Sequence, residues 1–324
     1  MNTIKYNSTG PDVDVLQTLL DIPHNPTHEF NKTTLQAVVD FQKQNGLDAD
    51  GIVGYKTWEM LFFHDERPQY GITETDFDRA AMLLNCEPAA LKAVQKVETG
   101  GKGGFLPSGR PTILFEGHIF WQQLRTRGID PQRFTSGNED ILYPKWTKAH
   151  YKGGEAEYER LLRARHINED AANASASWGM FQVMGFNYAA CGEPSVARFV
   201  RSMYQSECRQ LLLGVRFIKG NRPMLAALQK KDWKAFARLY NGPAYAQNRY
   251  DEKLSTAYSS FKNSAEKLNF WHEMPLFRKI MADCRGKMLP LQPKAASVQN
   301  EAGTKAIKEI KHGNTCYKYP GADR

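Results

Sequence analysis

The chain has 324 residues, of which 41% are hydrophobic and 24% are charged, a composition typical of a globular protein with about two domains. Its formal net charge of +8 at pH 7 favours an anionic partner, such as nucleic acid, anionic lipid or an anionic cell-wall polymer. No block of five consecutive Lys or Arg residues occurs and no segment approaches the ~18–20 apolar residues of a membrane span, which argues against a nucleic-acid-binding tail and against an integral membrane protein.

Three short helices are predicted in residues 1–64. Aliphatic residues recur at helical spacing in GPDVDVLQTLL (10–20) and in TLQAVVDFQKQNGL (34–47), and Gly46 is a suitable end for the second helix. The glycine-containing turn of DGIVGYKTWEMLF (50–62) leads into a third helix with Trp58 facing inward. The pattern alone predicts a small three-helix module and leaves its ligand open.

The spacing of these residues resembles the peptidoglycan-binding domain found on many cell-wall hydrolases. The resemblance is carried by Val15-Leu16-Gln17, Phe41-Gln42, Asp50-Gly51-Ile52-Val53-Gly54, Thr57 and Leu61. One departure is THEFN (27–31), where the family usually has Asp-Gly before the Phe. The resemblance implies a module that binds the cell wall, with Asp50, Gly51 and Trp58 as candidate wall-binding residues.

A polar segment with one Pro and one Gly, FHDERPQYG (63–71), reads as a linker. We therefore expect a binding module over residues 1–64, a linker over 65–71, a second domain over 72–262 and a C-terminal extension over 263–324. The second domain is predicted to open with a helix capped by Thr73 and to continue with a helix that begins near Pro88.

The second of these helices ends at an acidic residue, Glu98. Leu91, Val94 and Glu98 are spaced i, i+3 and i+7, so they share one apolar face, and Gly100 and Gly101 follow. Burial and the negative end of the helix dipole both raise the pKa of a carboxyl, and a carboxyl protonated near neutral pH suits a general acid. A buried glutamate paired with an Arg or Lys fits the same spacing.

Two later motifs bear on this choice. SASWGMFQVMGFNY (175–188) contains a Ser-x-Gly-x-x-Gln arrangement, and RLYNGPAYAQN (238–248) contains Tyr-Asn-Gly. With the preceding Glu-Thr-Gly, they resemble the three signatures of the goose-type lysozyme and lytic transglycosylase superfamily. Longer stretches, including VETGGKGGF, TILFEGHIFW and FARLYNGPAYAQNRYDEKL, resemble the N-acetylmuramidase domain of modular phage endolysins over about residues 72–262. The implied fold class is mainly α: a three-helix wall-binding module, then a lysozyme-like, α-rich (α+β) catalytic domain with a small β element.

The resemblance implies hydrolysis of the β-1,4 bond between N-acetylmuramic acid and N-acetylglucosamine in peptidoglycan, with Glu98 as the general acid. It places Gln182 and Tyr240 at the sugar site. Their motif neighbours Ser177 and Asn241 are further candidates, as are Trp178 and Phe181, the aromatics that flank the Ser-x-Gly-x-x-Gln motif. The second carboxylate is open. Glu116, at an expected strand end in LFEGH, is the first candidate and Asp140 a weaker one; alternatively, Glu116 caps the next helix or pairs with His118.

Three other functions stay open at this point. A lytic transglycosylase would form 1,6-anhydromuramic products without a second carboxylate. A wall-binding protein without activity and a secreted bacterial effector fit the same domain order. A metal-dependent amidase is disfavoured because no HExxH motif occurs and His118, His150 and His166 are not grouped as ligands, so we expect neither a metal nor another cofactor.

The start of the chain, MNTIKYNSTGPDVDV, shows no signal peptide, and the five cysteines form no CxxC pair. We expect synthesis in the host cytoplasm, holin-type release and action on periplasmic peptidoglycan as a monomer. No nucleic-acid partner is expected, and the basic extension over 263–324 suggests an electrostatic contact with an anionic outer membrane.

Overall fold

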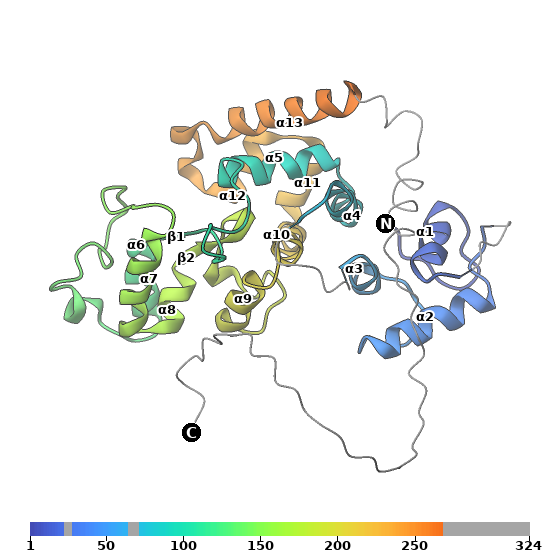
Figure 1. Cartoon of the computed structure of the whole chain (residues 1–324), viewed down its shortest axis with the longest axis horizontal. Helices are drawn as coiled ribbons and strands as arrows, with labels where there is room; N and C mark the ends of the chain where they lie inside the picture. Colours follow the sequence, from blue (N-terminus) through green and yellow to red (C-terminus); the bar gives the residue numbers. More distant parts are fainter. Residues whose placement is uncertain (23–27, 64–70, 268–324) are drawn as a thin grey trace, which may run out of the picture. The chain divides into compact units, whose positions relative to one another are not determined.

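The structure of the chain, a computed structural model, describes residues 1–22, 28–63 and 71–267 (Figure 1). The expected linker and the C-terminal extension lie almost entirely outside these ranges. Within them, no helix combines the length and the apolar character that crossing a membrane requires.

The N-terminal module contains the three predicted helices, α1 (Pro11–Leu19), α2 (Lys32–Gln44) and α3 (Tyr55–Phe63). The side chain of Asn31 caps α2 by accepting a hydrogen bond from the Thr34 N–H at 3.0 Å. The helices enclose a core without solvent exposure that includes Leu16, Phe30 and Val38.

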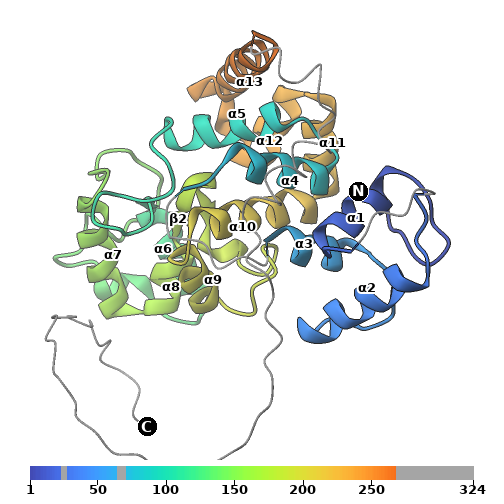
Figure 2. The same cartoon turned by 45° about the vertical axis from the view of Figure 1, so that its right-hand side comes forward.

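The second part of the chain contains a helical group, which is listed here in chain order: α4 (Glu74–Leu84), α5 (Pro88–Thr99), α10 (Glu207–Gly220), α11 (Arg222–Lys230), α12 (Trp233–Asn241) and α13 (Tyr250–Lys267). The long α13 packs along α5, and α4 packs against α5 and α10 (Figures 1 and 2). Thr73 caps α4 as predicted, in a reciprocal capping box with Asp76.

A second group is built around the small β element. Strands β1 (Ile113–Phe115), β2 (Ala176–Trp178) and β3 (Val183–Met184) form an antiparallel sheet in that order, with Ile113 opposite Trp178. Its helices are α6 (Gly117–Thr126), α7 (Ala156–Ile167) and α8 (Glu169–Ala174), with the short helix η1 (Pro131–Phe134) after α6. Helix α7 packs on β1, and α8 packs on α6 and α7 (Figure 2).

Three short helices follow the sheet residues of β2 and β3, namely η2 (Gly179–Phe181), η3 (Gly185–Asn187) and α9 (Val196–Met203), and η4 (Pro243–Asn248) joins α12 to α13. The buried Gln210 of α10 ties η2 to the segment after α5, because its amide accepts from the Met180 N–H at 2.9 Å and donates to the Gly104 carbonyl at 3.1 Å. A Cβ at Gly104 would lie 2.0 Å from Gln210 Oε1, so a larger residue there would displace the Gln210 side chain from these bonds.

Candidate active site

Glu98 lies in the last turn of α5, which ends where Gly100 adopts a left-handed conformation with φ of 61°. Leu91 and Val94 on the same face are fully buried, and the Glu98 side chain is partly buried. Burial raises the pKa of the Glu98 carboxyl from 4.5 to about 7, and a hydrogen bond from Asn241 opposes the shift. A carboxyl with this pKa carries a proton in part of the population at neutral pH, as a general acid must.

The Tyr-Asn-Gly motif ends α12 beside Glu98. Asn241 Nδ2 donates to Glu98 Oε1 at 3.0 Å, whereas Asn241 Oδ1 is buried and has no hydrogen-bond partner within the described residues. Tyr240 donates its hydroxyl to the Phe181 carbonyl at 2.5 Å. Burial, and then the nearby charge of Glu98, raise the pKa of Tyr240 well above 10, so its hydroxyl stays protonated. The motif therefore joins the acid of α5 to the turn after β2.

The Ser-x-Gly-x-x-Gln motif folds back on itself. Ser177 Oγ donates to Gln182 Oε1 at 2.8 Å, and Gln182 Nε2 donates to the carbonyls of Gly179 at 2.8 Å and Thr112 at 3.2 Å. Gln182 adopts a left-handed backbone conformation with φ of 45°, which these bonds hold in place. The side chains of Ser177 and Gln182 thus stabilise the turn that carries the Phe181 carbonyl.

Trp178 and Phe181 do not line the site. Their side chains have exposures of 0% and 1%, and the Trp178 indole N–H donates to the Asn173 carbonyl at 3.0 Å. A ring without exposed surface offers no face to a sugar, so the prediction that these two aromatics contact substrate is wrong. Both belong to the core: the Phe181 ring lies against Gly214 of α10, and the Trp178 indole reaches α8.

Glu116 follows β1 and occupies the cap position of α6, but its side chain does not cap that helix. Instead, Glu116 Oε2 accepts a hydrogen bond of 2.5 Å from the Tyr151 hydroxyl, and His118 Nδ1 lies 3.4 Å from the same oxygen. The carboxyl is thus held by a hydroxyl and a potential cation, and its side chain retains 15% exposure.

Tyr250, at the start of α13, was not singled out in the sequence. Burial raises its pKa, and so do the charges of Glu98 and then Glu116. The segment 143–151 approaches the same region, because Lys148 Nζ donates to Asn248 Oδ1 of η4 at 3.2 Å. Trp146 on this segment is 51% exposed, which makes it a better candidate for stacking on a sugar than Trp178.

A buried ion pair holds the end of β1 and thereby positions Glu116. Arg160 Nη1 lies 2.8 Å from Glu157 Oε2, and both side chains have no solvent exposure. Arg160 donates to the Phe115 carbonyl at 2.9 Å, while Glu157 accepts from the Phe115 N–H at 3.2 Å. The Arg160–Glu157 pair therefore binds both the backbone N–H and the backbone carbonyl of Phe115, the residue before Glu116.

Comparisons with known proteins agree with this geometry. The model of the N-acetylmuramidase family matches residues 87–262, which is more than half of the chain, and that of a putative peptidoglycan binding domain matches residues 9–61. The chain belongs to the N-acetylmuramidase family. It is also similar to the Burkholderia AP3 phage endolysin, for which a crystal structure exists: the two are 40% identical, with a TM-score of 0.54, over 81% of this chain and 100% of the other. The protein is accordingly a glycoside hydrolase with a lysozyme-like, mainly α fold.

The weaker candidate for a second carboxylate in the muramidase, Asp140, has a structural role. Although burial opposes it, the hydrogen bond and charge of Arg163 lower the pKa of Asp140, and the two side chains are 2.9 Å apart. Among the described residues, no cluster of three or more His, Cys, Asp or Glu side chains is arranged to hold a metal ion.

Of the three residues predicted to bind the wall, Gly51 and Trp58 lie inside the muramidase's N-terminal module and Asp50 is exposed. Trp58 is 1% exposed and donates its indole N–H to the Asn2 carbonyl at 2.9 Å. Asp50 Oδ1 accepts from the Ile52 N–H at 2.8 Å, and a Cβ on the buried Gly51 would lie 2.4 Å from the Leu35 side chain. The buried positions of Trp58 and Gly51 contradict their assignment as wall contacts, and Asp50 is engaged in a turn.

Proposed function

We propose that this muramidase is an endolysin that hydrolyses the glycan strands of peptidoglycan, with Glu98 as the general acid. Peptidoglycan is its substrate and the cell wall its place of action. The observation that carries the assignment is the raised pKa of Glu98 next to the Asn241 amide. Protonated Glu98 would donate its proton to the glycosidic oxygen as the bond between N-acetylmuramic acid and N-acetylglucosamine breaks.

Glu116 is our proposal for the second carboxylate. The hydrogen bond from Tyr151 and the neighbouring His118 hold this side chain in place, where a carboxylate can stabilise the positive charge of the oxocarbenium-like transition state or activate water. Ser177 and Gln182 support the site through the turn that they brace, and Tyr240 through its bond to that turn. The unpartnered Asn241 Oδ1 is suited to accept the N–H of a substrate N-acetyl group.

The test compares wild type with Glu98→Gln in a turbidity assay on Gram-negative cells whose outer membrane has been stripped. A general acid contributes about 10²–10⁴-fold in rate, so lysis by the variant should fall by that factor. Undiminished lysis would refute the role of Glu98. Mass spectrometry of the released muropeptides separates reducing muramic acid ends, expected here, from the anhydro ends of a lytic transglycosylase.

We further propose that the protein acts as a monomer without a nucleic-acid partner, that it reaches the periplasm by holin-type release, and that its net charge of +8 attracts it to an anionic outer membrane. Binding to anionic lipid vesicles that weakens as salt is added would support the last point, and salt-independent binding would count against it.

A further inference from the structure

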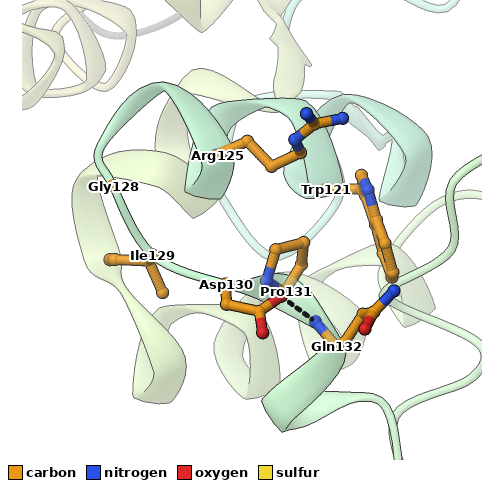
Figure 3. A pocket seen from close by; sticks show the side chains of 7 residues that line it. All are labelled: Trp121, Arg125, Gly128, Ile129, Asp130, Pro131 and Gln132. Carbon is orange, nitrogen blue, oxygen red and sulfur yellow. Dashed lines mark hydrogen bonds between the residues drawn. The ribbon is translucent and has the colours of Figure 1, made fainter.

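An open pocket of about 510 Å³ lies at the C-terminal end of α6, within the size range of small-ligand sites. One side is formed by Trp121 and Arg125, and the other side by the segment 128–132 that follows the helix (Figure 3). None of these residues belongs to the site around Glu98.

Local sequence explains the arrangement. Trp121 and Arg125 are four residues apart in α6, so they lie on the same face one turn apart. Gly128, with φ of 72°, reverses the chain after the helix, and the buried Pro131 anchors η1 so that Asp130 returns across from the helix. Because α6 begins directly after Glu116, a rise of 1.5 Å per residue places Trp121 and Arg125 roughly 8–14 Å along the helix axis from the backbone of Glu116.

Two polar side chains at this pocket, those of Trp121 and Arg125, have donors that the described part of the fold does not use. Within the part of the chain that the structure describes, neither the Arg125 guanidinium nor the Trp121 indole N–H has a hydrogen-bond or ion-pair partner, and Arg125 is exposed. One carboxylate oxygen of Asp130 accepts a hydrogen bond from the Gln132 N–H at 3.1 Å. Figure 3 shows Arg125 and Trp121 on the helix side, with the Trp121 ring extending toward Gln132 and with Asp130 and Pro131 on the segment across from them. The pocket thus combines a flat aromatic wall with separate hydrogen-bond donors and acceptors.

We propose that this pocket is a distal subsite for an N-acetylhexosamine ring of the glycan strand, a claim that rests on the proposed function. A pyranose ring has an apolar C–H face that an indole can cover, and hydroxyl and acetamido groups at its edge that need both donors and acceptors. The pocket lining holds the Asp130 carboxylate as well as Arg125, which disfavours a ligand whose recognition depends on negative charge alone, such as a stem peptide or a phosphate. A subsite at this distance from Glu116 would hold the strand beyond the bond that is cleaved.

The experiment uses the full chain carrying Glu98→Gln, which prevents turnover, and follows the tryptophan indole N–H signals by NMR during titration with chitotetraose. The chain has six tryptophans, and the signal that disappears in Trp121→Phe is that of Trp121. This signal should shift on titration. In Arg125→Ala the Kd reported by the Trp121 signal should rise about tenfold, as expected for one lost hydrogen bond from a charged group. Arg133→Ala, an exposed arginine of η1 that does not line the pocket, is the matched control and should keep the wild-type Kd.

Three outcomes would overturn the proposal: a Trp121 signal that chitotetraose does not move, a Kd that Arg125→Ala leaves unchanged, or a shift produced by free stem peptide and not by chitotetraose. Hydrolysis of purified peptidoglycan by the protein with Glu98 intact is measured in parallel. If the wall is cleaved but the signal does not move, only the subsite fails; if the wall is not cleaved, the proposed function fails.

Discussion

Asn241 Nδ2 and Glu98 Oε1 are 3.0 Å apart although 143 residues separate them in the chain. The bond favours the ionised carboxyl, whereas burial favours the protonated one. Burial has the larger effect, so the pKa of Glu98 is raised to about 7. The amide therefore sets how far the pKa of the acid rises.

Removing this amide should move the pH profile of the enzyme. In Asn241→Ala, the pKa of Glu98 loses the contribution that lowers it, so the fall of kcat/KM on the alkaline side should occur at higher pH than in wild type. The measurement is kcat/KM for soluble glycan fragments across the pH range. Asn263→Ala, on an exposed position of α13, is the control. An alkaline limb that stays in place would mean that the bond does not tune Glu98.

The raised pKa of Glu98 also predicts a stability effect. Between pH 4.5 and about 7 the folded protein holds this proton more tightly than the unfolded chain, so the free energy of unfolding decreases as the pH rises through that window. Gln carries no charge, so Glu98→Gln should be more stable than wild type at pH 8, by about 1–3 kcal/mol, and equally stable at pH 4. Urea unfolding at both pH values tests this, with Glu169→Gln at an exposed position as the control. Equal stability at pH 8 would contradict the prediction.

The role of Glu116 can be separated from that of its neighbours. If Glu116 is the second carboxylate, Glu116→Gln should lower kcat about 10²-fold or more, with little change in KM. Tyr151→Phe removes only the hydroxyl that holds the carboxyl and should cost about tenfold in kcat. Tyr6→Phe, at a position that is 41% exposed, should have no effect on turnover. Full activity of Glu116→Gln would show that Glu116 is not the second catalytic carboxylate and only precedes α6.

The Arg160–Glu157 pair should be costly to break. Arg160→Met leaves the Glu157 carboxylate buried without its cation, and we expect the free energy of unfolding to fall by about 3–5 kcal/mol. The matched control is Arg163→Met, because the Arg163–Asp140 pair is 41% and 32% exposed and should contribute at most about 1 kcal/mol. The double variant Arg160→Met/Glu157→Leu should recover only part of the loss, because the Phe115 N–H also loses its acceptor. Urea unfolding of the three variants measures these changes. Equal losses of unfolding free energy in Arg160→Met and Arg163→Met would contradict the argument from burial.

The sequence by itself was enough to predict the helices and the position of the candidate acid, Glu98. Helical periodicity is a local property that links residues three and four positions apart, so it was sufficient to place Glu98 on the apolar face of the last turn of α5. Capping is equally local, which is why the start of α4 at Thr73 was predictable. The order of the motifs, together with the family resemblance, indicated the enzyme class.

Only the tertiary structure decided which side chains surround the acid. The contacts of Asn241 with Glu98 and of Tyr151 with Glu116 depend on how distant elements pack, and no spacing in the chain encodes them. Strand β2 is buried on both faces, so the alternation that separates core from surface is absent, and Trp178 could not be recognised as a core residue. Burial on both faces is a property of the assembled sheet and its covering helices, and so it emerges only once they pack together.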